Sequence, residues 1–189
     1  MAIIYNAELH PTKAELLTQW LDRMYWGGSG DLEVLGSYRF DDAEGEVGLE
    51  GFIIRRGELT LHVPLTYRGA PLEAADQYLV GEIEHSVLGR RWVYDAMADP
   101  VAVHILNRAL AGEIPQAELY FYDEAGQFLG SEPNTVSVLV RGDIPEGWGN
   151  VAAHHVLNLE DDDAVSTEGR QLVATWGDGS AVIFSLIDA

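Results

Sequence analysis

The sequence contains no cysteine and a single lysine, Lys13, among its 189 residues. The lack of cysteine excludes a disulfide framework, thiolate zinc sites, iron–sulfur clusters and a cysteine nucleophile. No apolar run is long enough to span a bilayer, and the first residues lack the basic and long apolar parts of a signal peptide. We therefore expect a cytoplasmic protein that makes no contact with a membrane.

Motifs of common enzymes are also missing. The sequence has no G-x-x-x-x-G-K-[ST] phosphate loop, no G-x-G-x-x-G, no G-x-S-x-G elbow and no kinase catalytic loop of the H-R-D type. We predict that the chain uses no cofactor, holds no metal and carries no catalytic residue.

Basic residues are scarce, and this is the strongest signal in the composition. Eleven basic and 31 acidic side chains give a net charge of −20. Such a field repels nucleic acids and anionic membranes. The main role that we expect for this negative charge is to keep the protein soluble, and the alternative is that it docks on a basic protein.

The chain divides into two parts by composition and pattern. Residues 1–112 mix helical and strand patterns, whereas residues 113–189 read as an acidic, β-rich extension, packed on or continuous with the first sheet. The predicted class is α+β, with a twisted antiparallel sheet packed on two helices.

Two helices are predicted in the first part. Thr12 and Glu15 form a capping box that starts a helix, which an apolar stripe at three-to-four spacing extends to residue 26. Asp99 is the N-cap of a second helix, which ends at Gly112.

Strand patterns lie between these helices, at residues 32–40, 46–55, 58–67, 79–87 and 90–95. Strand 58–67 alternates cleanly between apolar and polar residues, which predicts one buried face and one polar face in water. Pro64 lies on the polar side and indicates a position at the edge of the sheet.

The hairpin from Glu82 to Asp95 is the candidate interaction site, because it gathers arginine and aromatic residues within an acidic chain. Arginine and tryptophan are typical of interface hot spots. The alternatives are that Arg90 and Arg91 form salt bridges with Glu82 and Glu84, that Trp92 belongs to the core, or that the two glutamates perform acid–base catalysis. The candidate residues are Glu82, Glu84, His85, Arg90, Arg91, Trp92, Tyr94 and Asp95.

Two further groups allow a functional interpretation. Trp26 and Trp148 lie among glycines, where an exposed aromatic platform could stack on a sugar, although most tryptophans are core residues. His154 and His155 precede the acidic run 160–163, but adjacent residues of a strand point to opposite faces and do not share a metal easily. The acidic run itself is typical of a solvated loop.

The central block resembles the N-terminal cap of maltokinases, which phosphorylate maltose with ATP in a pathway that links trehalose to α-glucan. The resemblance rests on the segments 63–68 (VPLTYR) and 81–95 (GEIEHSVLGRRWVYD) and extends over residues 1 to about 112. It implies a curved antiparallel sheet around a helix, of cystatin-like topology.

The rest of the chain departs from this family, whose ATP site and catalytic aspartates lie in lobes that follow the cap. Residues 113–189 carry no such motif, so no catalytic residue is carried over. We expect a stand-alone, non-catalytic interaction or regulatory protein of trehalose, maltose or α-glucan metabolism, whose partner is a second copy or an enzyme of sugar metabolism. The alternatives are a sugar- or glucan-binding module and an enzyme of unknown type that uses Glu82 or Glu84.

Overall fold

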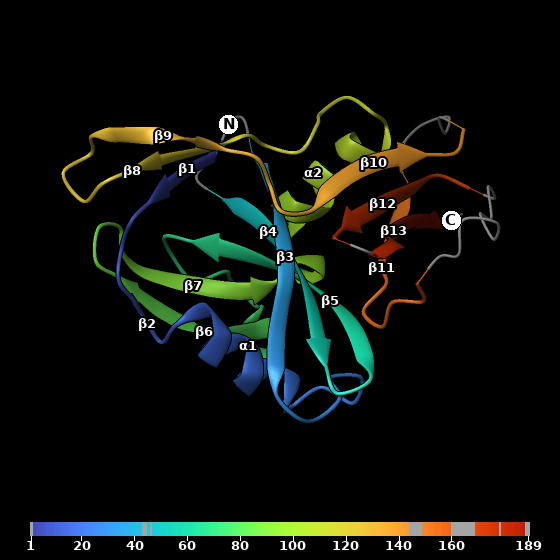
Figure 1. The fold of residues 1–189 in the computed structure, drawn as a ribbon, viewed down its shortest axis with the longest axis horizontal. Helices are drawn as coiled ribbons and strands as arrows, with labels where there is room; N and C mark the ends of the chain where they lie inside the picture. The colour runs from blue at the N-terminus through green and yellow to red at the C-terminus, as the bar shows by residue number, and fades with distance from the viewer. Residues whose placement is uncertain are drawn as a thin grey trace.

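Strands dominate the fold in the computed structural model, which describes residues 2–42, 45, 47–143, 149–159, 169–177 and 179–187 (Figure 1). The helices are α1 (Lys13–Leu21), α2 (Pro100–Leu110) and the short 3-10 helices η1 (Asp76–Tyr78) and η2 (Ala96–Ala98). The strands are β1 (Ala2–Tyr5), β2 (Leu9–His10), β3 (Leu32–Asp41), β4 (Gly48–Arg56), β5 (Leu59–Arg68), β6 (Leu79–His85), β7 (Gly89–Asp95), β8 (Leu119–Tyr122), β9 (Phe128–Glu132), β10 (Ser137–Arg141), β11 (Asn150–Ala153), β12 (Gln171–Trp176) and β13 (Gly179–Ile187).

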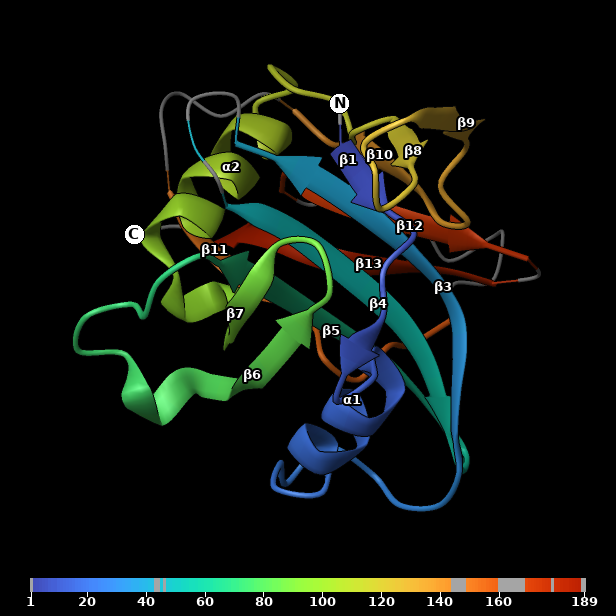
Figure 2. The same ribbon diagram turned by 90° about the vertical axis from the view of Figure 1, so that its left-hand side faces the viewer.

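A six-stranded antiparallel sheet forms the middle layer, in the order β2-β6-β7-β5-β4-β3, and it curls around α1 (Figure 2). Its five longer strands match the predicted strands to within a few residues. The predicted strands 46–55 and 58–67 leave Arg56 and Gly57 for the turn, but the turn falls at Gly57 and Glu58, because Arg56 still pairs with Leu59. Gly57 has a φ of +58°, which glycine adopts without strain.

Helix α1 begins as the sequence predicts and ends earlier. Thr12 Oγ1 accepts the Glu15 N–H at 3.2 Å, and Glu15 Oε2 accepts the Thr12 N–H at 2.8 Å, which completes the capping box. The helix stops at Leu21 instead of residue 26, because the chain folds back there. A Cβ on Gly27 would lie only 2.0 Å from the Leu21 carbonyl oxygen.

The first hydrophobic core lies between α1 and one face of the sheet. Odd-numbered residues of β5 and even-numbered residues of β4 meet the apolar stripe of the helix, and burying each such side chain stabilises the fold by about 1.5–3 kcal/mol. The buried members are Leu16, Leu17, Trp20, Leu21, Phe52, Ile54, Leu61, Val63, Leu65, Val80, Ile83 and Val93.

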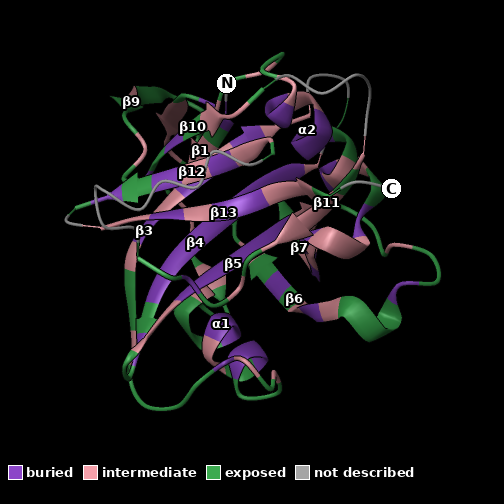
Figure 3. Ribbon diagram, turned by 90° about the vertical axis from the view of Figure 1, so that its right-hand side faces the viewer, coloured by how far each residue is buried: buried purple, intermediate pink, exposed green. Residues whose placement is uncertain are grey.

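The second core fills the opposite face of the same sheet. There α2 and a four-stranded antiparallel sheet, in the order β10-β12-β13-β11, cover the central strands (Figure 3). This core takes side chains from both halves of the chain, among them Tyr38, Phe40, Leu49, Ile53, Ile105, Leu106, Leu110, Val136, Leu172, Ile183 and Phe184.

Strand β5 is therefore covered on both sides, and the prediction of a polar face in water is wrong. His62 and Thr66, both on the face predicted to be wet, are fully buried. The His62 ring lies edge-on to the Phe184 ring, with 4.9 Å between their centroids. The polar ring of His62 is satisfied inside the protein, by the Tyr38 hydroxyl at 2.7 Å and the His154 carbonyl oxygen at 3.2 Å, so its polarity does not indicate exposure.

The edge position predicted from Pro64 is also wrong, although the reason for the proline is visible. On the side away from β4, the His62 N–H donates to the His155 carbonyl at 2.9 Å, and β7 pairs with β5 only from Leu65 onward. Pro64 lies at the junction between these two neighbours. Its missing N–H therefore costs no ladder hydrogen bond.

The two parts of the chain are interleaved. Strand β1 pairs in parallel with β8, which pairs with β9, so the first strand belongs to a three-stranded sheet otherwise built from the second part. The α+β class is confirmed, with the helices on opposite faces of the central sheet. The cystatin-like topology and the division into domains 1–112 and 113–189 stay predictions.

Candidate interaction site

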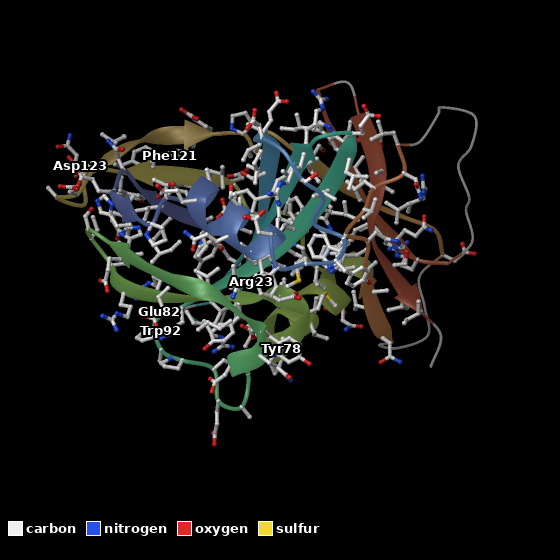
Figure 4. The ribbon with its side chains drawn as sticks, turned by 90° about the horizontal axis from the view of Figure 1, so that it is seen from below. Arg23, Tyr78, Glu82, Trp92, Phe121 and Asp123 are labelled. Atoms are coloured by element: carbon white, nitrogen blue, oxygen red, sulfur yellow. The ribbon has the colours of Figure 1, made fainter. Side chains whose placement is uncertain are left out.

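The β6–β7 hairpin holds the predicted interaction residues in register. Glu82 lies opposite Trp92, and Glu84 lies opposite Arg90. Because side chains alternate along a strand, these four residues project from one face, away from α1. Figure 4 shows Glu82 and Trp92 next to each other at the outer edge of the hairpin.

Arg90 joins the two glutamates into one ionic cluster. Its Nη1 lies 3.4 Å from Glu82 Oε2, and its Nε donates to Glu84 Oε1 at 2.8 Å. This pairing confirms the salt-bridge interpretation for Arg90. All three side chains are about half exposed, so solvent screens both pairs and they add little to the stability of the hairpin.

Two of the predicted interaction residues on β7, Tyr94 and Asp95, form hydrogen bonds within the protein, and Trp92 is only partly buried. Tyr94 is buried, and its hydroxyl accepts the Leu72 N–H at 3.0 Å. The Asp95 carboxylate accepts the Met97 N–H at 3.0 Å and so caps η2. Trp92 is half-buried, which leaves part of its ring on the surface beside the ionic cluster.

A buried ion pair ties this region to α2. The Arg68 guanidinium donates to both carboxylate oxygens of Asp99, at 2.6 and 2.7 Å, and the Asp99 side chain is fully buried. Asp99 also accepts the Val101 N–H at 3.0 Å, which confirms it as the N-cap of α2. Burial is the largest single influence and opposes ionisation, but the hydrogen bonds and the charge of Arg68 act with the other groups that donate to the carboxylate, and together they lower the pKa of Asp99.

His85 and Arg91 lie on the opposite face of the same hairpin, apart from the ionic cluster. Both line a cleft of about 500 Å³ on the α1 side of the sheet. Lys13, Glu50 and Tyr67 line the same cleft, and the sequence analysis did not single them out as a site. The signal was present: Glu50 and Tyr67 are polar residues at positions where the strand alternation points into the core.

Of the two residues of the predicted sugar platform, the structure describes Trp26. The Trp26 ring is half-buried against the first core and stacks on the His155 ring, with 4.2 Å between centroids and 7° between planes. One face of this ring is thus occupied by a protein side chain. Trp148 lies outside the described residues, so a platform formed by the two tryptophans stays a prediction.

The two adjacent histidines have separate partners. His154 Nε2 lies 2.8 Å from Ser185 Oγ, and His155 Nδ1 lies 3.1 Å from the His62 carbonyl oxygen. Within the described residues, no three His, Asp or Glu side chains are grouped in a way that could hold a metal. The acidic run 160–163 lies outside the described residues.

The hairpin lies in a part of the chain that matches a known family. No curated protein matches the chain. Neither α-helix of the described part has the length and apolar character needed to cross a membrane. The family match covers less than half of the chain and is shorter than the resemblance over residues 1 to about 112 that the sequence suggested. Residues 20–99, from the end of α1 to the N-cap of α2, match the maltokinase N-terminal cap domain.

Proposed function

We propose that this protein is a non-catalytic interaction or regulatory module of maltose, trehalose or α-glucan metabolism, and that the outer face of the β6–β7 hairpin contacts its partner. The match of residues 20–99 to a domain named as the cap of a sugar kinase carries the link to this metabolism. The partner is a second copy of the chain or an enzyme that acts on these sugars.

The composition of the hairpin face supports a protein contact. Trp92 offers apolar ring surface next to Glu82, Glu84 and Arg90, whose charges sum to a single negative charge. Tyr78, just before β6, is 43% exposed and adds aromatic surface near the start of the hairpin. Aromatic and arginine side chains beside charged residues are typical of a hot spot with a polar rim.

The state of the two glutamates supports the non-catalytic part of the proposal. A general acid needs surroundings that hold its proton, such as an apolar pocket or a second carboxylate without a counter-ion. Glu82 and Glu84 instead are half exposed and share a guanidinium. Incubation with ATP, magnesium and maltose should give no sugar phosphate, and turnover that co-purifies with the protein would refute this part.

The contact is tested by a photo-crosslinking amino acid at position 84, with position 58 as control. Glu58 is equally exposed but lies in the β4–β5 turn, at the other end of the sheet (Figure 2). Position 84 should give adducts with a second copy or with an enzyme of maltose or trehalose metabolism, and position 58 should not. Equal adducts at both positions would contradict the proposal.

A charge reversal then measures the contribution of the hairpin. Arg90→Glu should weaken association about thirtyfold, or about 2 kcal/mol, which is the size of a hot-spot loss. Arg55→Glu is the matched control, because Arg55 also forms an exposed ion pair, with Glu33 at 3.3 Å, at the far end of the sheet. Equal weakening by both variants would indicate a general effect of charge.

A further inference from the structure

The α1 side of the central sheet changes character along its strands. Beneath α1 its inward side chains are apolar, but beyond the first turn of the helix they become polar. Glu50 follows Phe52 on the inward face of β4, and Tyr67 follows Leu65 on β5. By the alternation of side chains along a strand, both residues point inward, where a packed core would have apolar residues. Such departures from the expected pattern are found at functional sites.

These polar side chains surround a cleft rather than a packed core. The cleft has a volume of about 500 Å³, within the roughly 300–1,000 Å³ of small-molecule sites. The sheet forms its floor, and the segment from β1 to the start of α1 forms its wall. Ile3, Tyr5 and Leu9 from that wall give it an apolar side.

One end of the cleft is built around the only lysine of the chain. Lys13 Nζ donates to both carboxylate oxygens of Glu50, at 2.8 and 2.7 Å, and lies 5.6 Å from the centroid of the Tyr67 ring. The Tyr67 hydroxyl is buried near Glu50 and forms no hydrogen bond of ordinary geometry to the described residues. Burial, and next the charge of Glu50, raise the pKa of Tyr67 well above its ordinary value, so the hydroxyl stays protonated. A buried hydroxyl without a partner is costly unless a ligand or water satisfies it.

The other end of the cleft presents nitrogen donors. His85 Nδ1 accepts the N–H groups of Val87 and Leu88, at 3.2 and 3.1 Å, which leaves the ring proton on Nε2. Burial, and next the charges of Arg91 and Lys13, lower the pKa of His85, so the ring is neutral. Arg91 donates one N–H to the Arg90 carbonyl and forms no ion pair with the described part of the chain.

The charges around the cleft select the class of ligand. Among the described residues that line it, Lys13, Arg39 and Arg91 are cationic, and Asp41, Asp42 and Glu50 are carboxylates. The charges of these described residues sum to zero, although the chain as a whole carries −20. An anion would meet the carboxylates and the field of the whole protein, and a cation would meet the three basic groups.

A neutral molecule with many hydroxyl groups fits all of these features. Each hydroxyl both donates and accepts, so it can pair with a carboxylate on one side and a guanidinium or imidazole N–H on the other. The apolar wall would receive the C–H face of a sugar ring. We infer that this cleft is a binding site for a neutral saccharide, with Arg91, His85 and the Tyr67 hydroxyl as hydrogen-bonding groups. The site is independent of the proposed hairpin contact, because it lies on the other face of the sheet.

Calorimetric titration of the full chain with glucose, maltose and trehalose tests this inference. Tyr67→Phe removes only the unpartnered hydroxyl, so it should weaken binding about tenfold while leaving the melting temperature unchanged or higher. Arg91→Gln should also weaken binding about tenfold. Arg55→Gln is the control: Arg55 is an exposed arginine that pairs with Glu33 at 3.3 Å, outside both the cleft and the hairpin face, and its replacement should leave saccharide affinity unchanged.

Three outcomes would overturn the inference. The first is that none of the neutral saccharides binds at millimolar concentration. The second is that binding occurs but neither Tyr67→Phe nor Arg91→Gln weakens it, which would locate the sugar elsewhere on the protein. The third is that inorganic phosphate or glucose 6-phosphate binds more tightly than the neutral sugars in the same titration, which would make the cleft an anion site.

Discussion

The buried histidine of β5 should make the protein sensitive to mild acid. His62 Nδ1 lies 3.2 Å from the His154 carbonyl oxygen, and because a carbonyl only accepts, Nδ1 must carry the proton. Its Nε2 therefore accepts the Tyr38 hydroxyl, at 2.7 Å. Burial, and next the charge of His155, lower the pKa of His62 from 6.5 to about 3. The folded protein thus holds this ring neutral.

The size of the effect follows from proton linkage. As the pH falls below 6.5, the unfolded chain takes up a proton on His62, whereas the folded protein does not until about pH 3. Stability that is present above pH 6.5 is therefore lost across this window. Between pH 7.5 and 5.0 the loss from this one residue is about 2 kcal/mol.

Urea unfolding at pH 7.5 and 5.0 measures this loss, with His62→Gln as the comparison. Glutamine offers a donor and an acceptor but does not titrate, so the wild type should lose about 2 kcal/mol more than the variant between the two pH values. Tyr38→Phe should lower stability at both pH values and keep the pH dependence. Equal pH dependence in the wild type and His62→Gln would refute the reasoning, because it would mean that folding does not restrict protonation of this ring.

Two further predictions concern the cores and the link to α2. Leu61→Ala and Phe184→Ala, on opposite faces of the central sheet, should cost about 2–5 and 3–5 kcal/mol in urea melts, and a negligible cost for Phe184→Ala would show that the second face is loosely covered. Asp99→Ala should lower the free energy of unfolding by about 3–5 kcal/mol, because it leaves Arg68 without its buried partner. Asp95→Ala removes only a cap and should lower it by about 1 kcal/mol. Equal losses would contradict the role of the ion pair.

Local signals in the sequence predicted the elements well, because they depend on neighbouring residues. The capping box at Thr12, the N-cap at Asp99 and the strands of the central sheet are all local patterns. The packing on the second face of β5 is not local. Phe184 lies against His62, and the His62 N–H donates to the His155 carbonyl. Alternation shows which residues share a face of a strand, but it does not show what packs there.

Of the two candidate sites, the sequence predicted the hairpin but not the cleft. The salt bridge of Arg90 with Glu84 was among the expected alternatives, but the register was not, because the predicted strands 79–87 and 90–95 would place Arg90 opposite Val87, whereas His85 pairs with Gly89 in the structure. The cleft was not, because it assembles Lys13, Glu50 and Arg91 from a helix and two strands that are far apart in the sequence. The inward positions of Glu50 and Tyr67 were the signal in the sequence that pointed to it.

The interleaving of the two halves also has a consequence for how the chain folds during synthesis. When β5 and β7 have left the ribosome, the second face of their sheet still lacks the strands around Phe184, and β1 still lacks β8. The nascent chain must then hold a broad apolar surface open until its last strands emerge. Contacts between such distant segments slow folding and leave partly folded chains prone to aggregation. Expression of a segment that stops near residue 112 should therefore depend strongly on chaperones, whereas the full chain should release them.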